Sequence, residues 1–252
     1  MSLLTWTEIR DAIARDAGVI IPIGATEQHG YHLPISTDCI LPVELAHSVA
    51  PHLDFLVAPP IIYGCRSRPL SGGGQSFPGT ISLSARTFMS VLEDVLCEFI
   101  RHGFRRIVLL NWHYENTHFT YEAATVAYEQ ARINNVRIMV HDTPGGDPKP
   151  ETMDALFHGE FPGWGAEHAA IYETSVMLHL RPELVLMDRA VDDCAPIRPP
   201  YDLVPPPESF IAPSGTLWKA TRASAAVGKL VWDEMVTTVI DEIATGLSPT
   251  RS

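Results

Sequence analysis

Side chains that could bind metal or move protons are concentrated near the start of the chain. The stretch Gly24–Ile40 reads GATEQHGYHLPISTDCI and carries Glu27, His29, His32 and Asp38. Neutral imidazole together with carboxylate oxygen is the usual donor set for zinc and manganese. The residue types therefore indicate a metal site, and other parts of the chain must supply its remaining ligands.

A second group of such side chains follows another apolar run. The segment Asn111–Asn116 reads NWHYEN, carries His113 and Glu115, and comes directly after the apolar segment 105–111. The first group follows a similar segment, 18–24. Parallel sheets bind ligands at the carboxyl ends of their strands, so we expect the two groups to converge there. A site for two ions needs five or six ligands with one shared carboxylate, and these groups can supply them.

Four residues of these groups are predicted to bind metal, namely Glu27, His29, Asp38 and His113. For His32, which lies beyond the cluster between Tyr31 and Leu33, we expect a structural or supporting role. The other histidines have no carboxylate partner in register and are interpreted as structural: His47, His52, His102, His118, His141, His158 and His179.

A third group lies in the segment Gly163–Ser175, GWGAEHAAIYETS, which carries Glu167, His168 and Glu173. If His168 begins a helix, Glu173 follows five residues later, so the two side chains do not stack on one helical face. They need not share a role. One could bind metal while the other moves protons.

The elements that must position these groups alternate along the chain. Short apolar runs rich in Ile and Val predict strands at 18–24, 55–64, 105–111 and 136–142. Helices are predicted at 42–53, 84–103, 118–133 and 217–243. Strands that alternate with helices predict a mainly parallel sheet between layers of helices. Two Pro/Gly-rich segments, 143–161 and 195–215, are predicted to be loops that cover a site or an interface.

The helix at 84–103 has the clearest signals. Ser84 is a plausible N-cap and Gly103 a plausible end, while Val91, Val95, Leu96 and Phe99 recur at helical spacing. No change of composition marks a domain boundary, so residues 1–252 are predicted to form a single domain.

The composition argues against two classes of binding partner and indicates the cellular compartment. The formal net charge of −12 argues against a nucleic-acid backbone or an anionic membrane as partner. The first residues are charged early and lack the long apolar core of a signal peptide. Four scattered cysteines, with no CxxC spacing, are typical of the reduced thiols of a cytoplasmic protein.

Five segments together resemble the creatininase (creatinine amidohydrolase) family. They are GATEQHGYHLPISTD, SGGGQSFPGTISL, NWHYENTHF, FPGWGAEHAAIYETSVML and PPYDLVP, and the resemblance runs from about Trp6 to about Lys229. It implies a three-layer α/β/α fold, a centre of two divalent ions such as zinc or manganese, and hydrolysis of an amide bond. It also implies a homo-oligomer, often a hexamer, that acts on a small molecule.

Residue by residue, the resemblance assigns roles to three sets of side chains. The implied metal ligands are Glu27, His29, Asp38, His113 and Glu173, with Asp38 bridging the ions. Glu115 would be a base beside the metals or itself a ligand, and His168 would be the proton shuttle. The substrate pocket would be formed by Ser71, Gly72, Gly73, Gly74, Tyr114 and Trp164.

The substrate pocket departs from the pattern of creatininase proper at three places. Gly165 stands where that enzyme has an aspartate, the loop after the fourth strand has no tryptophan, and Trp112 replaces a usual glycine. The expected reaction is therefore the two-metal hydrolysis of a small cyclic amide, with creatinine to creatine as one candidate. Hydrolysis of another ring, a lactone or a cyclic polyol ketone, remains an alternative. A non-catalytic metal-binding scaffold is an alternative of another class, and the presence of Glu115 and His168 counts against it.

Overall fold

The computed structural model describes residues 1–133, 135–142 and 144–248. Its centre is a sheet of four strands, β1 (Gly18–Ile23), β2 (Phe55–Val57), β3 (Arg106–Asn111) and β4 (Arg137–His141). The strand order is β2-β1-β3-β4, and every neighbouring pair is parallel. The mainly parallel sheet predicted from the alternating elements is confirmed.

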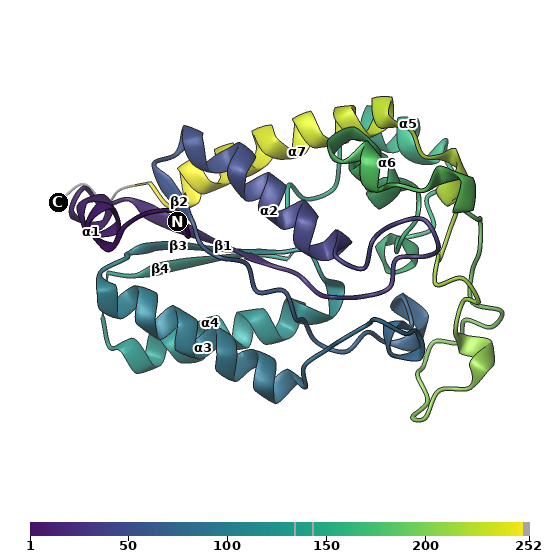
Figure 1. The fold of residues 1–252 in the computed structure, drawn as a ribbon, viewed down its shortest axis with the longest axis horizontal. Helices are drawn as coiled ribbons and strands as arrows, with labels where there is room; N and C mark the ends of the chain where they lie inside the picture. Colours follow the sequence, from purple (N-terminus) through teal and green to yellow (C-terminus); the bar gives the residue numbers. More distant parts are fainter. Residues whose placement is uncertain (134, 143, 249–252) are drawn as a thin grey trace.

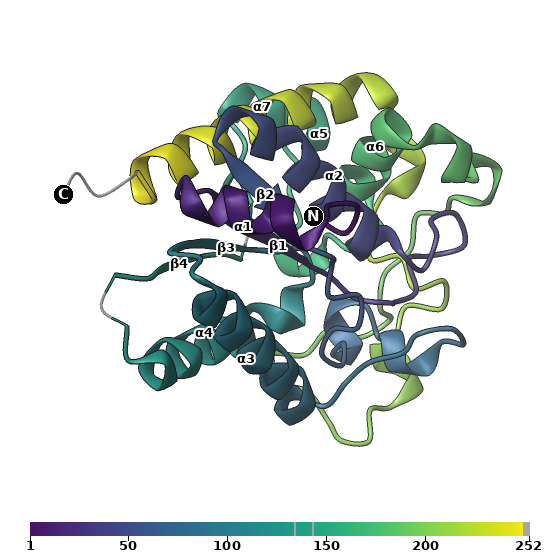
Figure 2. The same cartoon turned by 60° about the vertical axis from the view of Figure 1, so that its left-hand side comes forward.

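Helices cover both faces of the sheet. The described residues form seven α-helices, namely α1 (Trp6–Ala14), α2 (Thr37–Val49), α3 (Ala85–His102), α4 (Thr117–Ala131), α5 (Pro150–Phe157), α6 (Ile171–Leu180) and α7 (Ala225–Gly246). Figure 1 shows α3 and α4 below the sheet, and α2, α5, α6 and α7 above it. Figure 2 shows the same sheet between its two helical layers from another side. The predicted three-layer α/β/α architecture is confirmed.

The two central strands are apolar except for Arg106 and Asn111 at the ends of β3, because both of their faces are covered. All residues of β1 and β3 are buried. Successive side chains point to opposite faces. Ile20 packs into a core cluster with α2, α6 and α7, whereas Ile21 packs into a second cluster with α3 and α4. The central strands therefore join two hydrophobic cores and form a rigid base for the loops at their carboxyl ends.

Helix α3 matches its predicted bounds. The Ser84 hydroxyl accepts a hydrogen bond from the backbone of Thr87, and Gly103 ends the helix in the left-handed region at φ 113°. Of the predicted apolar stripe, Leu96 is confirmed as a core residue, whereas Val91 is wrong. The buried stripe consists of Phe88, Leu92, Leu96 and Ile100. Val95 and Phe99 are partly buried against the same cluster, and Val91 is exposed.

Helix α2 begins five residues earlier than predicted, at Thr37 rather than Pro42, so Asp38 lies in its first turn. Pro42 lies inside the helix and has no N–H to donate to the carbonyl of Asp38, four residues before it. That carbonyl lies directly against Gly24, where a Cβ would collide with it. The end of β1 and the start of α2 are therefore in close contact, and Asp38 is fixed above the strand.

Three other predicted segments differ from the structure. Strand β2 ends at Val57 instead of continuing to 64, since Pro59 and Pro60 cannot donate ladder hydrogen bonds. Helix α7 begins at Ala225, after the Ser224 cap, and not at 217. The predicted loop 143–161 contains helix α5, which begins with a proline at its first position, where no N–H is needed. Thr143 itself lies outside the described residues.

No helix among the described residues is long and apolar enough to cross a membrane.

Candidate metal centre

The predicted ligands meet where β1 and β3 end. These strands are neighbours, and Ile23 at the end of β1 pairs with Asn111 at the end of β3. Two groups of buried side chains lie close enough together to hold an ion. One consists of Glu27, Asp38 and His113, and the other of His29, His168 and Glu173.

Asp38 connects the two groups. Its Oδ1 lies 3.1 Å from Nε2 of His29, and its Oδ2 lies 3.1 Å from Nδ1 of His113. The residue is 2% exposed, and both histidines are also buried. One carboxylate thus presents one oxygen to each group, which is the geometry that a shared ligand between two ions requires.

The remaining carboxylates complete each group. Oε2 of Glu27 lies 3.1 Å from Nδ1 of His113, on the side of Asp38 Oδ2. Oε2 of Glu173 lies 3.7 Å from Nε2 of His29 and accepts a hydrogen bond of 2.7 Å from the backbone N–H of Ala169. Each side of Asp38 therefore has one imidazole nitrogen and a second carboxylate.

The far nitrogens of both histidines indicate what the near nitrogens can bind. Nδ1 of His29 lies 3.1 Å from the carbonyl of Glu27, and Nε2 of His113 lies 3.0 Å from the carbonyl of Cys65. A carbonyl only accepts, so each of these nitrogens carries a proton. In the neutral ring, the other nitrogen then presents a lone pair to Asp38, which also has only lone pairs. A cation between them resolves that contact, and the site fits two divalent ions.

The pKa values of these residues also indicate a site for cations. Burial opposes the charged form of His29, but Asp38 and Glu173 outweigh it and raise its pKa well above 6.5. Burial likewise opposes charge on His113, and Glu27 and Asp38 raise its pKa well above 6.5. Burial favours the neutral form of Asp38, yet the two histidines hold its pKa below the ordinary value. Without metal, the cluster keeps protons on both rings; two divalent ions would supply that positive charge instead.

Glu115 lies beside the centre and is held in place by a loop. Its Oε2 lies 3.5 Å from Nε2 of His113, and its Oε1 accepts hydrogen bonds from the backbone of Arg68 at 3.1 Å and from the Ser71 hydroxyl. His168 lies against His29, with ring centroids 4.4 Å apart. Both predicted acid–base residues therefore reach the same cavity as the ligands.

That cavity collects most of the predicted site residues. It has a volume of about 50 Å³ and is lined by Glu27, Asp38, Ser71, Trp112, His113, Tyr114, Glu115, Trp164, Gly165, Glu167, His168 and Glu173. The predicted glycines differ among themselves. A Cβ on Gly72 would lie 3.0 Å from Oε1 of Glu27 and 3.1 Å from Nε2 of His168, so Gly72 approaches the centre closely. A Cβ on Gly73 would instead meet Ile211.

A second compartment of about 140 Å³ continues from this cavity and shares Trp112, Tyr114, Trp164, Glu167 and Glu173 with it. Its walls are aromatic, with the Trp112 and Tyr172 rings stacked at 6.4 Å and Trp164 edge-on to Tyr172 at 5.5 Å. The indole N–H of Trp164 donates to Asp147 at 2.6 Å. The sequence did not indicate Asp147, because only the fold brings the loop after β4 onto Trp164. It did not indicate Tyr172 either, because only the fold packs α6 against Trp112.

His32 stands apart from both groups, as expected. It is buried, its Nε2 lies 2.8 Å from the Thr174 hydroxyl, and burial lowers its pKa to about 4. A neutral histidine that pairs with a hydroxyl serves to position the helix that carries Glu173.

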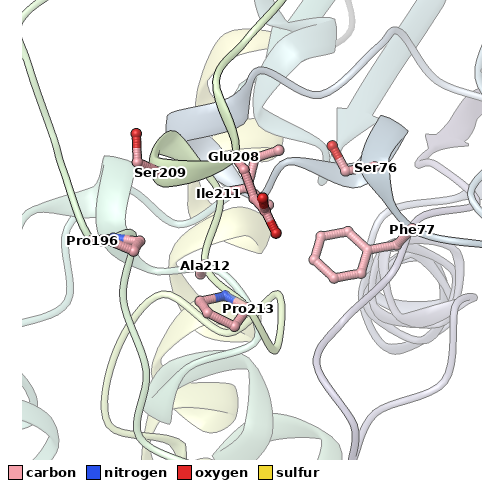
Figure 3. A pocket seen from close by; sticks show the side chains of 8 residues that line it. All are labelled: Ser76, Phe77, Pro196, Glu208, Ser209, Ile211, Ala212 and Pro213. Carbon is pink, nitrogen blue, oxygen red and sulfur yellow. The ribbon is translucent and has the colours of Figure 1, made fainter.

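The proline-rich segment 195–215 lies beside the glycine-rich loop 71–79. A groove of about 560 Å³ lies between them. Figure 3 shows Phe77 on one side of this groove and Pro196, Ser209 and Pro213 on the other. Arg198 donates to the carbonyls of Leu70 and Gly165 at 3.2 Å each. The segment therefore braces the two loops that flank the metal cavity, and the groove itself contains none of the predicted site residues.

Comparisons with known proteins agree with this geometry. The family model "Creatininase: Creatinine amidohydrolase" matches residues 2–243. A creatinine amidohydrolase of Pseudomonas putida is 38% identical over 98% of this chain and 96% of its own length. A mycofactocin precursor peptide peptidase of Mycobacterium ulcerans is 33% identical over 90% of this chain and 84% of its own.

Two solved structures are also very similar to the chain. A mutant creatininase of Zn–Zn type is 36% identical and superposes with a TM-score of 0.94. A creatininase in a Mn form is 37% identical and superposes with a TM-score of 0.95. Each comparison covers 99% of this chain and 98% of the other.

Proposed function

Since this chain belongs to the creatininase family and is a hydrolase, we propose that it hydrolyses the amide bond of a small cyclic molecule at a centre of two divalent ions. The observation that carries the proposal is Asp38, whose two oxygens each face a different imidazole at 3.1 Å. Relatives of Zn–Zn and Mn type support zinc and manganese as the ions.

Five side chains would hold the ions. Glu27, His113 and one oxygen of Asp38 form one site; His29, Glu173 and the other oxygen form the second. Bound there, two divalent ions supply a water that ionises near neutral pH and polarise the carbonyl under attack.

The acid–base residues perform the proton transfers. Glu115 takes a proton from the attacking water as its oxygen forms a bond to the carbonyl carbon. That proton passes to His168, which delivers it to the nitrogen as the carbon–nitrogen bond breaks. The loop of Ser71 and Gly72 holds Glu115 and closes one side of the cavity. The enzyme ends the cycle with its original protons.

The pocket supports a planar substrate. Trp112, Trp164, Tyr172 and Tyr114 surround the second compartment, and Asp142, Glu167 and Glu173 contribute the carboxylates of its lining. Trp112 and Glu167 offer an aromatic and a carboxyl contact to a substrate, whereas Gly165 and the loop after β4 lack the aspartate and the tryptophan of creatininase proper. Creatinine is therefore the first substrate to test. The mycofactocin precursor peptide peptidases among the relatives make a short peptide the second candidate, since the compartment extends the cavity beyond the ions.

The decisive experiment measures turnover and metal content on the same sample. Creatinine, other five- and six-membered cyclic amides, lactones, cyclic ketones and a short peptide are compared at equal concentration. The proposal expects a cyclic amide to give the highest kcat/KM, with two ions bound per chain. Hydrolysis of a lactone, ketone or peptide alone would replace the amide assignment, and two bound ions without any turnover would favour a scaffold.

We further propose a cytoplasmic homo-oligomer, a hexamer by resemblance to the family. Four free thiols, Cys39, Cys65, Cys97 and Cys194, support a reducing compartment. Light scattering of the purified protein tests the subunit number directly.

A further inference from the structure

Gln28, which lies between the predicted ligands Glu27 and His29, has no role in the site described so far. Its side chain is only 5% exposed, and each of its polar atoms has a partner. Oε1 accepts from the backbone N–H of Gly30 at 2.9 Å. Nε2 donates to the carbonyls of Gly72 at 2.8 Å and Gly215 at 3.1 Å. These partners fix the orientation of the amide, since carbonyls accept and an N–H donates.

The amide joins three segments that are far apart in the sequence. Gly72 belongs to the glycine-rich loop, Gly215 ends the proline-rich segment, and His168 lies on the loop before α6. The fit is tight at Gly215, where φ is 84° and a Cβ would collide with the Gln28 amide. Gln28 therefore fixes the relative position of two segments next to the metal cavity.

His168 is bound to the same residue. Its Nε2 lies 2.9 Å from the backbone carbonyl of Gln28 and 2.9 Å from the side-chain Nε2 of Gln28. Three carbonyls thus need a hydrogen-bond donor: those of Gly72, Gly215 and Gln28 itself. The Gln28 amide has two hydrogens, and only a proton on Nε2 of His168 supplies the third.

The other tautomer leaves the network incomplete. If His168 carried its proton on Nδ1, its Nε2 would need a hydrogen from the Gln28 amide. One of the two glycine carbonyls would then lose its donor, and the Gln28 carbonyl would have none. A buried polar group without a partner is costly, so the network favours the Nε2–H form.

We propose that Gln28 is a positioning residue that holds His168 as the Nε2–H tautomer, so that Nδ1 is the atom that exchanges protons with the substrate. This inference rests on the role of His168 under the proposed function. Nδ1 takes up the proton that Glu115 has taken from the attacking water and passes it to the leaving nitrogen, while the Nε2–H keeps donating its hydrogen bond to the Gln28 carbonyl. His168 lines the cavity, and among the described residues no hydrogen bond engages its Nδ1.

The direct test is the tautomer of His168 in the zinc-loaded protein at pH 8. Long-range proton–nitrogen NMR on histidine-labelled protein, with His168→Gln to assign the signals, should show Nε2 protonated and Nδ1 bare. A protonated Nδ1 with a bare Nε2 would overturn the proposal. This measurement needs no turnover, so its outcome is separate from that of the amide-hydrolase proposal.

The kinetic test replaces the amide with a side chain of similar size, Gln28→Met. The expected result is a kcat lower by about tenfold to a hundredfold, the usual effect of losing a group that orients a functional side chain. KM should change little, and both zinc ions should remain. The matched control is Gln75→Met. Gln75 lies in the same glycine-rich loop as Gly72, is exposed, and donates a side-chain hydrogen bond to the Ser82 hydroxyl.

A Gln28→Met protein that keeps two zinc ions and a kcat within about twofold of the wild type would contradict the positioning role. If the variant loses its zinc, Gln28 acts on the ligands rather than on His168, and the proposal is equally wrong. Should the wild type hydrolyse no amide, the NMR result still decides the tautomer.

Discussion

At the scale of single residues, Asp38 is the side chain on which both halves of the metal centre depend. We expect Asp38→Ala to lose both ions, because each half loses a carboxylate oxygen that lies 3.1 Å from its histidine. Elemental analysis of the purified variant measures the loss. Asp11→Ala, at an exposed position, is the control and should keep both ions. A full metal complement in Asp38→Ala would remove Asp38 from the ligands.

His168 and Glu173 belong to the same buried group but are assigned different work. His168→Ala should keep both ions and lose turnover by roughly a hundredfold or more, the size usual for a general acid. Glu173→Ala should lose one ion together with its activity. Metal stoichiometry and kcat are measured side by side for the two variants. The division of roles fails if His168→Ala loses an ion or turns over at the wild-type rate.

Some of these site residues could be predicted from the sequence alone, and others could not. Glu27, His29, Asp38 and His113 follow apolar strands, so their convergence could be inferred from the rules of parallel sheets. Glu173 could not, because it comes from α6 and reaches the centre only through tertiary packing. Its assignment rested on the family resemblance. The role of Gln28 could not be predicted either, since its hydrogen-bond partners Gly72 and Gly215 lie 44 and 187 residues away in the sequence.

At the scale of elements, the short 3-10 helix Trp164–Ala166 places an indole between two cavities. Trp164→Ala should lower kcat/KM on the preferred substrate and leave both ions in place, because the ring lines the pocket and its N–H donates to Asp147 rather than to a predicted ligand. Its packing on Phe157 and Tyr172 adds a modest loss of stability. Kinetics and thermal melting are compared with Trp6→Ala, at an exposed position. Unchanged kcat/KM with a large fall in melting temperature would make Trp164 a core residue.

Element types were predictable where local signals agree with packing, as in α3 with its Ser84 cap and Gly103 end. Boundaries failed where tertiary contacts decide them. Pro42 suggested a helix start, but Asp38 and the close contact with Gly24 extend α2 toward the site. The segment 143–161 looked like a loop, yet α5 forms there because its Leu156 and Phe157 are buried in the core.

At the scale of the whole molecule, metal and pH should act together on stability. Without metal, the pKa values of His29 and His113 are raised above 6.5 in the folded protein. Their protonation therefore stabilises the fold below about pH 6.5, and this contribution is lost as the pH rises through the raised values. Zinc needs the deprotonated rings, so its affinity increases over the same range.

The expected result is a melting temperature that zinc raises more at about pH 8.5 than at about pH 6. Calorimetry of zinc-loaded and chelator-treated protein at both values measures the difference. In Asp38→Ala, the difference should be small at either pH. An equal effect of zinc at both pH values in the wild type would show that these histidines do not bind the ion.

The central claim is that two ions shared through Asp38 make this chain an amidohydrolase. The most direct measurement is turnover of the preferred cyclic amide while zinc is added back stepwise to chelator-treated protein. Activity should stay low through the first equivalent per chain and rise to its plateau with the second. Full activity at one equivalent or none, or no hydrolysis of any cyclic amide with two ions bound, would contradict the account.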